Sequence, residues 1–133
     1  MANTAAHLVD RVLPSVPVRQ WVLSLPFELR RLAAFDAKVL TAFVRILAEV
    51  LADRYRRCGS ERGSTRCESG AVTFVQRFGS SLNLNVHFHV VMLDGVFVRD
   101  AEARAIFHHA PPPSRDELEG VVERTRHRIR AWL

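Results

Sequence analysis

The stretch NVHFHVVML, residues 85–93, carries the residues best suited to chemistry in this 133-residue chain. His87 and His89 are separated by one residue inside a run of β-branched and large apolar residues. Side chains at positions i and i+2 of a strand project from the same face, roughly 6–7 Å apart. Two imidazoles at that separation can bind one metal ion. A pair of ordinary sheet histidines has the same pattern, so the spacing alone leaves both interpretations open.

A histidine site of a different kind is also open. Cupin-type barrels combine a His-x-His pair with a Glu a few residues later and a further His. The sequence after His89, VVMLDGVFVRD, has no Glu at that place, and Asp94 is expected in a turn. His108 and His109 could still complete a site with His87 and His89, which would make the chain a small metalloenzyme.

The two cysteines do not predict a zinc site. Cys58 and Cys67 enclose a segment rich in glycine, serine and charge, CGSERGSTRC, which predicts a loop. Eight intervening residues is not a zinc-knuckle spacing, and no second Cys or His pair lies nearby. We therefore expect two free thiols.

The pattern around the histidines predicts the strand that positions them. Alternate side chains form an apolar face (Val86, Phe88, Val90, Met92) and an opposite face (Asn85, His87, His89, Val91). The apolar face can pack against helices, which leaves the histidines on the other side of the sheet. The dipeptide Asp94-Gly95 is the strongest short signal for a β-hairpin, so residues 96–98 are predicted to return as the next strand.

The remaining sequence predicts helices that cover such a sheet. Apolar residues at steps of three and four predict one long helix from Phe27 to about Arg57, and a second helix follows the capping box of Ser114 and Glu117. Further strands are expected at 18–25, 71–78 and about 105–108. The fold class is therefore α+β, an antiparallel sheet with helices packed on one face. Residues 1–17 are expected to be an arm and 18–133 a domain.

The charge of the chain suits an anionic partner. The formal net charge is +5, and all nineteen basic residues except Lys38 are arginine, whose planar fork suits phosphate. A basic excess favours nucleic acid, although coding in GC-rich DNA gives the same arginine bias. The N-terminus lacks the apolar core of a signal peptide, and no apolar run approaches the ~20 residues of a membrane span. We expect a soluble cytoplasmic protein.

Three stretches together resemble a known family. They are AVTFVQRFGSSLNLNVHFHVVMLDGVFV (71–98), PPPSRDELEGVVERTRHRIRAWL (111–133) and AAHLVDRVLPSVPVRQWVLSLPFELR (5–30). They resemble the HUH-type two-tyrosine transposases of bacterial rolling-circle insertion sequences, of the insertion-sequence-ninety-one type. The resemblance runs from about Ala6 to Leu133. It is most specific at 71–98, where His87-Phe88-His89 matches the histidine–hydrophobic–histidine motif.

The resemblance implies a ferredoxin-like HUH fold and metal-dependent nicking and joining of single-stranded DNA at transposon ends. It implies that His87 and His89 bind a divalent cation, Mg²⁺ or Mn²⁺, with Gln76 as a candidate third ligand. Arg77 and Asn83 are candidate DNA contacts. In the family a tyrosine attacks the DNA to give a 5′-phosphotyrosine, and a second tyrosine handles the partner strand.

The chain departs from the family at the nucleophile. Its one tyrosine, Tyr55, lies at the end of the first long helix, whereas the family's tyrosines lie on a downstream helix. The family's N-terminal cysteine-rich zinc domain is also missing. We therefore expect a partial domain, a central piece of a transposase that lacks the nucleophile, with Tyr55 a half-buried helix residue. A non-catalytic DNA-binding module that competes with an intact transposase, the small metalloenzyme, and an unfolded remnant remain as alternatives.

Overall fold

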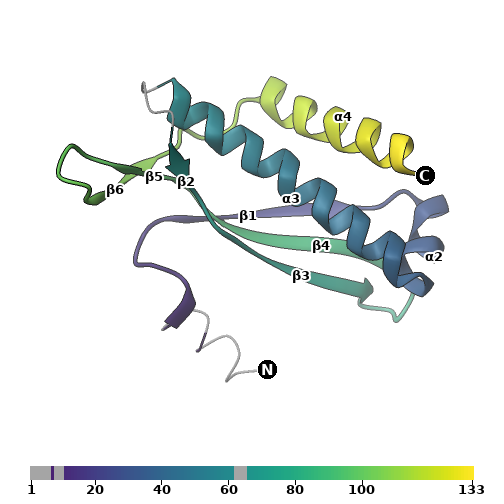
Figure 1. The fold of residues 1–133 in the computed structure, drawn as a ribbon. Helices are drawn as coiled ribbons and strands as arrows, with labels where there is room; N and C mark the ends of the chain where they lie inside the picture. The colour runs from purple at the N-terminus through teal and green to yellow at the C-terminus, as the bar shows by residue number, and fades with distance from the viewer. Residues whose placement is uncertain (1–6, 8–10, 62–65) are drawn as a thin grey trace.

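Strands and helices follow one another along the chain in the order that Figure 1 shows. The computed structural model describes residue 7, residues 11–61 and residues 66–133, so most of the predicted arm lies outside the described residues. The elements are β1 (Val18–Ser24), α2 (Phe27–Phe35), α3 (Ala37–Ser60), β2 (Cys67–Glu68), β3 (Ala71–Phe78), β4 (Leu84–Leu93), β5 (Gly95–Arg99), β6 (Ala105–His109) and α4 (Arg115–Trp132). The α+β class is confirmed.

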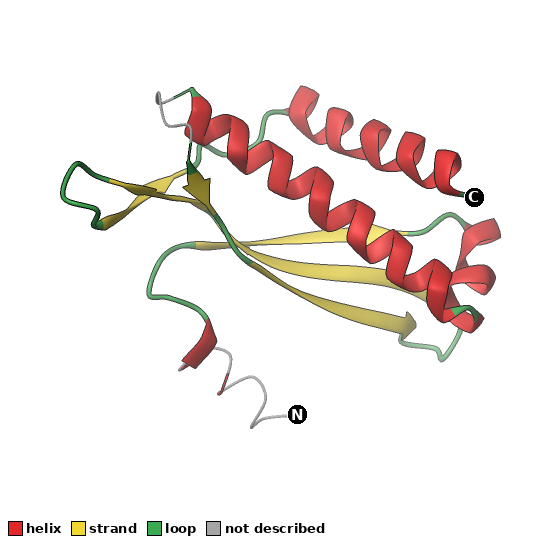
Figure 2. Ribbon diagram, in the orientation of Figure 1, coloured by secondary structure: helices red, strands yellow, loops and turns green. Residues whose placement is uncertain are grey.

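The strands form two antiparallel three-stranded sheets, with orders β1-β4-β3 and β2-β5-β6. The predicted strands at 18–25, 71–78 and 105–108 are present as β1, β3 and β6. The strand that carries the histidines, β4, is the centre of the first sheet. Figure 2 shows α3 and α4 on one side of this sheet, so the prediction of helices on one face is confirmed.

The core lies between the apolar face of β4 and the helix α3. Val86, Phe88 and Val90 are at most 1 % exposed and belong to one buried cluster with Phe43 and Leu51 of α3. Burying each such side chain contributes about 1.5–3 kcal/mol relative to leaving it exposed. This packing fixes which way β4 faces, because a shift by one residue would bring the histidines into the core.

Helix α4 packs against α3 through residues spaced four apart, Val121, Thr125 and Ile129, all of which are buried. Its predicted capping box is confirmed, since the Ser114 side chain accepts from the backbone N–H of Glu117 and the Glu117 side chain accepts from that of Ser114. No helix in the described part of the chain has the length and apolar character that a membrane crossing needs.

The single long helix predicted from Phe27 to Arg57 is wrong. The chain breaks into α2 and α3 at Asp36, whose backbone is extended and whose side chain accepts from the backbone N–H groups of Lys38 and Val39. An aspartate that satisfies the free N–H groups of a first turn begins a new helix there. Helix α3 also continues to Ser60, so Cys58 lies in a helix and not in the predicted loop, whose residues 62–65 lie outside the described residues.

The hairpin predicted at Asp94-Gly95 is also wrong. Strand β5 follows β4 directly but pairs with β2 and β6 in the second sheet. Asp94 is only 4 % exposed and binds side chains from other elements, and a Cβ at Gly95 would lie 2.2 Å from the carbonyl oxygen of His108. The pair is therefore the junction at which the chain passes from one sheet to the other.

Candidate metal centre on the histidine face

The face of the first sheet that points away from α3 carries His87 and His89. We call this surface the histidine face. By alternation and register it consists of one row from each strand: Val18, Gln20, Val22 and Ser24 of β1, Asn85, His87, His89 and Val91 of β4, and Val72, Phe74 and Gln76 of β3. Several of its apolar side chains are solvent-exposed, Val22 by 56 % and Phe74 by 43 %. The face is therefore accessible to a ligand.

The register brings Gln76 of β3 directly opposite His87. Opposed residues of an antiparallel pair project from the same face with their Cβ atoms about 4.5–5.5 Å apart. Two of the three candidate ligands are thus cross-strand neighbours, and the third, His89, is two residues along β4. The three candidates come from two adjacent strands of one sheet, which is a rigid support.

The two imidazole rings contact each other, with centroids 4.9 Å apart and an angle of 62° between the planes. Nδ1 of His87 lies 2.7 Å from the backbone oxygen of Asn85. Because a carbonyl only accepts, Nδ1 of His87 must donate, and the neutral ring then carries its lone pair on Nε2. A histidine held in this way is preorganised to bind a metal through Nε2.

His89 is held from the other neighbouring strand. Its Nδ1 lies 2.7 Å from the amide nitrogen of Gln20 on β1, and its Nε2 is buried without a hydrogen-bond partner. Leaving a buried polar atom unpaired costs about 1–3 kcal/mol. A cation bound at Nε2 would remove that cost when this nitrogen carries the lone pair. Because the Gln20 amide nitrogen can only donate, its observed orientation puts the ring proton on Nε2, and a turn of the amide that brings its oxygen to Nδ1 would free Nε2 for a metal.

Gln76 contributes an amide whose orientation is fixed. Its nitrogen Nε2 donates to the backbone oxygen of Phe78 at 3.2 Å, where the β3–β4 register is irregular. This leaves the amide oxygen Oε1 as the atom suited to a cation. Two imidazole nitrogens and an amide oxygen suit Mn²⁺ better than Mg²⁺, which prefers an all-oxygen shell. The residues present therefore fit a divalent cation.

The alternative site with His108 or His109 is not formed. Among the residues that the structure describes, no three His, Cys, Asp or Glu side chains come together as a metal site. His109 belongs to β6 in the second sheet, and its Nε2 lies 3.0 Å from Oδ2 of Asp94. The two cysteines are free thiols, as predicted, and burial raises the pKa of Cys58.

The two candidate DNA contacts lie at one end of β3. Arg77 is exposed next to Gln76, and Asn83 is exposed in the turn between β3 and β4. The turn is closed by a hydrogen bond from the N–H of Gly79 to the backbone oxygen of Asn83, at 2.9 Å. Both side chains are thus at the end of the sheet where Gln76 and His87 also lie.

Tyr55 is remote from this face. It is fully buried on α3, which corrects the expected half-buried position, and its hydroxyl donates to Oδ1 of Asp94 at 3.1 Å. Nε1 of Trp21 donates to the same hydroxyl at 3.4 Å. Burial raises the pKa of Tyr55. The sheet lies between this hydroxyl and the histidines, because Trp21 projects from β1 on the face opposite to Gln20.

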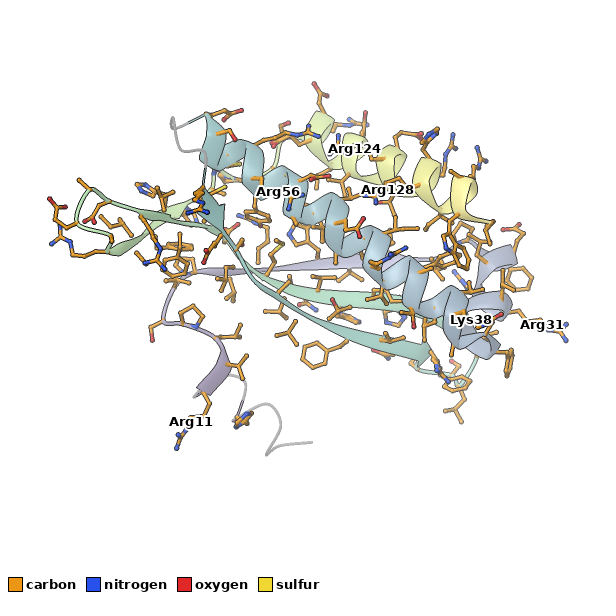
Figure 3. The ribbon with its side chains drawn as sticks, in the orientation of Figure 1. Arg11, Arg31, Lys38, Arg56, Arg124 and Arg128 are labelled. Atoms are coloured by element: carbon orange, nitrogen blue, oxygen red, sulfur yellow. The ribbon has the colours of Figure 1, made fainter. Side chains whose placement is uncertain are left out.

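Basic side chains occur on several elements of the described chain. Figure 3 labels basic side chains on the arm, α2, α3 and α4. Some are paired with acids, such as Arg56 with Asp53 and Arg128 with Glu49. The rows that form the histidine face contain no Asp, Glu, Lys or Arg. Its chemistry therefore depends on imidazole and amide groups.

Sequence reasoning missed the residues that hold the rings. Gln20 alternates with apolar residues in a short strand, and nothing local links it to His89, which is 69 residues away. Only the register of β1 against β4 brings the two together. Asn85 orients His87 through its backbone oxygen, so the type of its side chain could not have predicted this contact.

Comparison with known proteins finds one similarity, to a family model that covers the C-terminal part of the chain. Residues 70–132 match the family model Y2_Tnp, described as "Putative transposase". No curated protein and no solved structure matches the chain. The matched segment begins just before β3 and includes β4 and α4, and therefore contains His87, His89 and Gln76. The similarity to this transposase family therefore covers residues 70–132, a little under half of the chain.

Proposed function

We propose that this chain binds single-stranded DNA at transposon ends through a divalent cation, Mg²⁺ or Mn²⁺, on the histidine face. His87 and His89 are the nitrogen ligands, and Gln76 supplies an amide oxygen. One observation carries the proposal: Gln76 lies directly opposite His87 on the face that both histidines share. All three residues lie in the segment that matches the transposase family.

The proposed class is the HUH-type two-tyrosine transposase. A divalent ion, when bound, polarises the scissile phosphate and steadies its developing charge. The residues of this chain hold and orient the partners of that reaction. His87 and His89 would hold the ion on the central strand, and Arg77 and Asn83 would contact the DNA backbone at the same end of the sheet.

The covalent step needs a nucleophile that this sequence does not supply. Its one tyrosine is Tyr55, and the hydroxyl of Tyr55 is buried behind the sheet. This observation favours a second candidate function, a non-catalytic DNA-binding module that competes with an intact transposase for transposon ends. In both functions the chain holds the metal and the DNA without cleaving it.

DNA binding tests the proposal. Fluorescence anisotropy with a labelled single-stranded oligonucleotide measures Kd in Mn²⁺ and in chelator. We expect Mn²⁺ to tighten binding to the wild-type chain by about tenfold, or roughly 1.4 kcal/mol. The substitution His87→Ala should abolish this gain, whereas His127→Ala, which alters an exposed histidine of α4, should keep it. Equal Kd values with and without Mn²⁺ would overturn the proposal.

A further inference from the structure

The hydrogen bond between Gln20 and His89 indicates a role for a residue that is not itself one of the three proposed ligands. Gln20 lies on β1, the strand beside β4, and its amide nitrogen lies 2.7 Å from Nδ1 of His89. The other nitrogen of the same ring, Nε2, is buried and has no hydrogen-bond partner. The ring is therefore held at one nitrogen and unpaired at the other.

The amide of Gln20 can present either of two groups to the ring. When its NH₂ group donates to Nδ1, that nitrogen carries the lone pair, and Nε2 carries the proton and cannot bind a cation. When its oxygen faces the ring, Nδ1–H donates to it, and Nε2 presents a lone pair. A half-turn of one side-chain amide thus changes whether His89 can be a ligand.

We propose that Gln20 is a positioning residue for the metal centre, whose amide fixes the ring of His89 and selects the nitrogen that is free to bind a divalent cation. The inference rests on the proposed function, in which His89 is a ligand. Gln20 acts through His89. His87 needs no such residue, because the backbone oxygen of Asn85 only accepts and keeps the proton on Nδ1.

The protonated nitrogen of His89 can be observed without a metal. Long-range ¹H–¹⁵N spectra of the metal-free chain, at a pH where both rings are neutral, identify which nitrogen carries the proton. A carboxylate only accepts, so Gln20→Glu should place the proton of His89 on Nδ1, while Gln20→Leu should leave it on Nε2. The proton of His87 should stay on Nδ1 in both variants. An unchanged position for His89 in both variants would overturn the proposal.

Metal affinity gives a second, independent readout. In titrations with Mn²⁺, Gln20→Leu should weaken binding by about 10–100-fold, the usual effect of losing a partner of a ligating histidine. Gln20→Glu should bind at least as tightly as the wild type. The control is His127→Ala, an exposed histidine of α4 away from the histidine face, which should bind normally.

The two readouts separate the failure of this inference from the failure of the proposed function. Wild-type affinity in Gln20→Leu would overturn the inference and leave the metal centre standing. A wild-type chain that binds no Mn²⁺ would overturn the metal centre, and with it the selection of a ligand nitrogen. The spectra of the metal-free variants would then still decide whether Gln20 sets the protonation of His89.

Discussion

Asp94 is the residue at which the two sheets and α3 meet. Its carboxylate accepts two hydrogen bonds from Arg19, at 2.8 and 2.7 Å, one from Tyr55 at 3.1 Å and a contact from His109 at 3.0 Å. Burial alone raises the pKa of Asp94, but the hydrogen bonds from Arg19 and Tyr55 and the charge of Arg19 outweigh it. The pKa of Asp94 therefore lies below its ordinary value of 3.8.

This lowered pKa makes Asp94 a source of stability that acid removes. The contribution is fully present above the ordinary pKa and is lost as the pH falls through the lower pKa of the folded state. We expect Asp94→Asn to lower the free energy of unfolding by about 3 kcal/mol at neutral pH, because Arg19 loses a buried charged partner. The variant should also show a weaker loss of stability as the pH falls below the ordinary aspartate pKa of 3.8.

Urea unfolding at a series of pH values measures both effects. The matched control is Asp53→Asn, which removes an aspartate paired with Arg56 at the surface and should change stability by less than about 1 kcal/mol. An Asp94→Asn variant as stable as this control, with the pH dependence of the wild type, would show that the carboxylate is not a stabilising centre.

At the scale of the elements, two glycines test the junction between β4 and β5. A Cβ at Gly95 would lie 2.2 Å from the backbone oxygen of His108, whereas a Cβ at Gly120 of α4 would meet only the flexible end of Arg124, at 3.1 Å. We expect Gly95→Ala to destabilise the fold by about 2–3 kcal/mol through overpacking. Gly120→Ala should stabilise it by about 0.5–1 kcal/mol, because alanine favours a helix interior.

Thermal and urea unfolding of the two variants check this pair of opposite effects. The same chemical change, one added methyl group, is made in both, so the difference reports the surroundings alone. A tolerated Gly95→Ala substitution would contradict the close approach of β5 and β6 at this junction.

The elements could be predicted from the sequence where their signals are local. The alternation in β4 and the capping box of α4 determined both elements and the face on which the histidines lie. The break at Asp36 was missed because the apolar spacing continues across it, from Phe35 to Val39, and neither glycine nor proline marks it. The hydrogen bonds that cap α3 at Asp36 are local, but in the sequence they are masked by apolar spacing that continues without a break.

The misread hairpin has a different cause. The partners of Asp94 are Arg19, Tyr55 and His109, at separations of 75, 39 and 15 residues. Tertiary contacts of this kind override the turn preference of an Asp-Gly pair, and no local pattern announces them. The same reason kept Gln20 out of the predicted site, whereas Gln76 could be proposed because it lies on the neighbouring strand of the same motif.

At the scale of the whole molecule, the first sheet separates two chemically different sides. One side carries the histidines and amides of the histidine face, and the other carries the buried network of Tyr55, Trp21 and Asp94. A hydroxyl inside the core cannot reach a phosphate bound on the opposite face of a sheet. The arrangement separates the proposed metal and DNA site from the chain's only tyrosine.

This separation predicts that the chain forms no covalent link to DNA. After incubation with single-stranded DNA and Mn²⁺, denaturing electrophoresis should show no protein–DNA adduct for the wild type or for Tyr55→Phe. A tyrosine-containing transposase of the same class serves as the positive control. An adduct that disappears in Tyr55→Phe would mean that the hydroxyl reaches the DNA, which the observed burial does not allow.

The metal centre itself is tested most directly by titrating Mn²⁺ into the purified chain and counting the sites by calorimetry. We expect one site in the wild type and in His127→Ala, and none in the double variant His87→Ala/His89→Ala, with all three chains equally folded by circular dichroism. Equal binding by the double variant and the wild type, or no binding by the wild type, would contradict a metal centre on the histidine face.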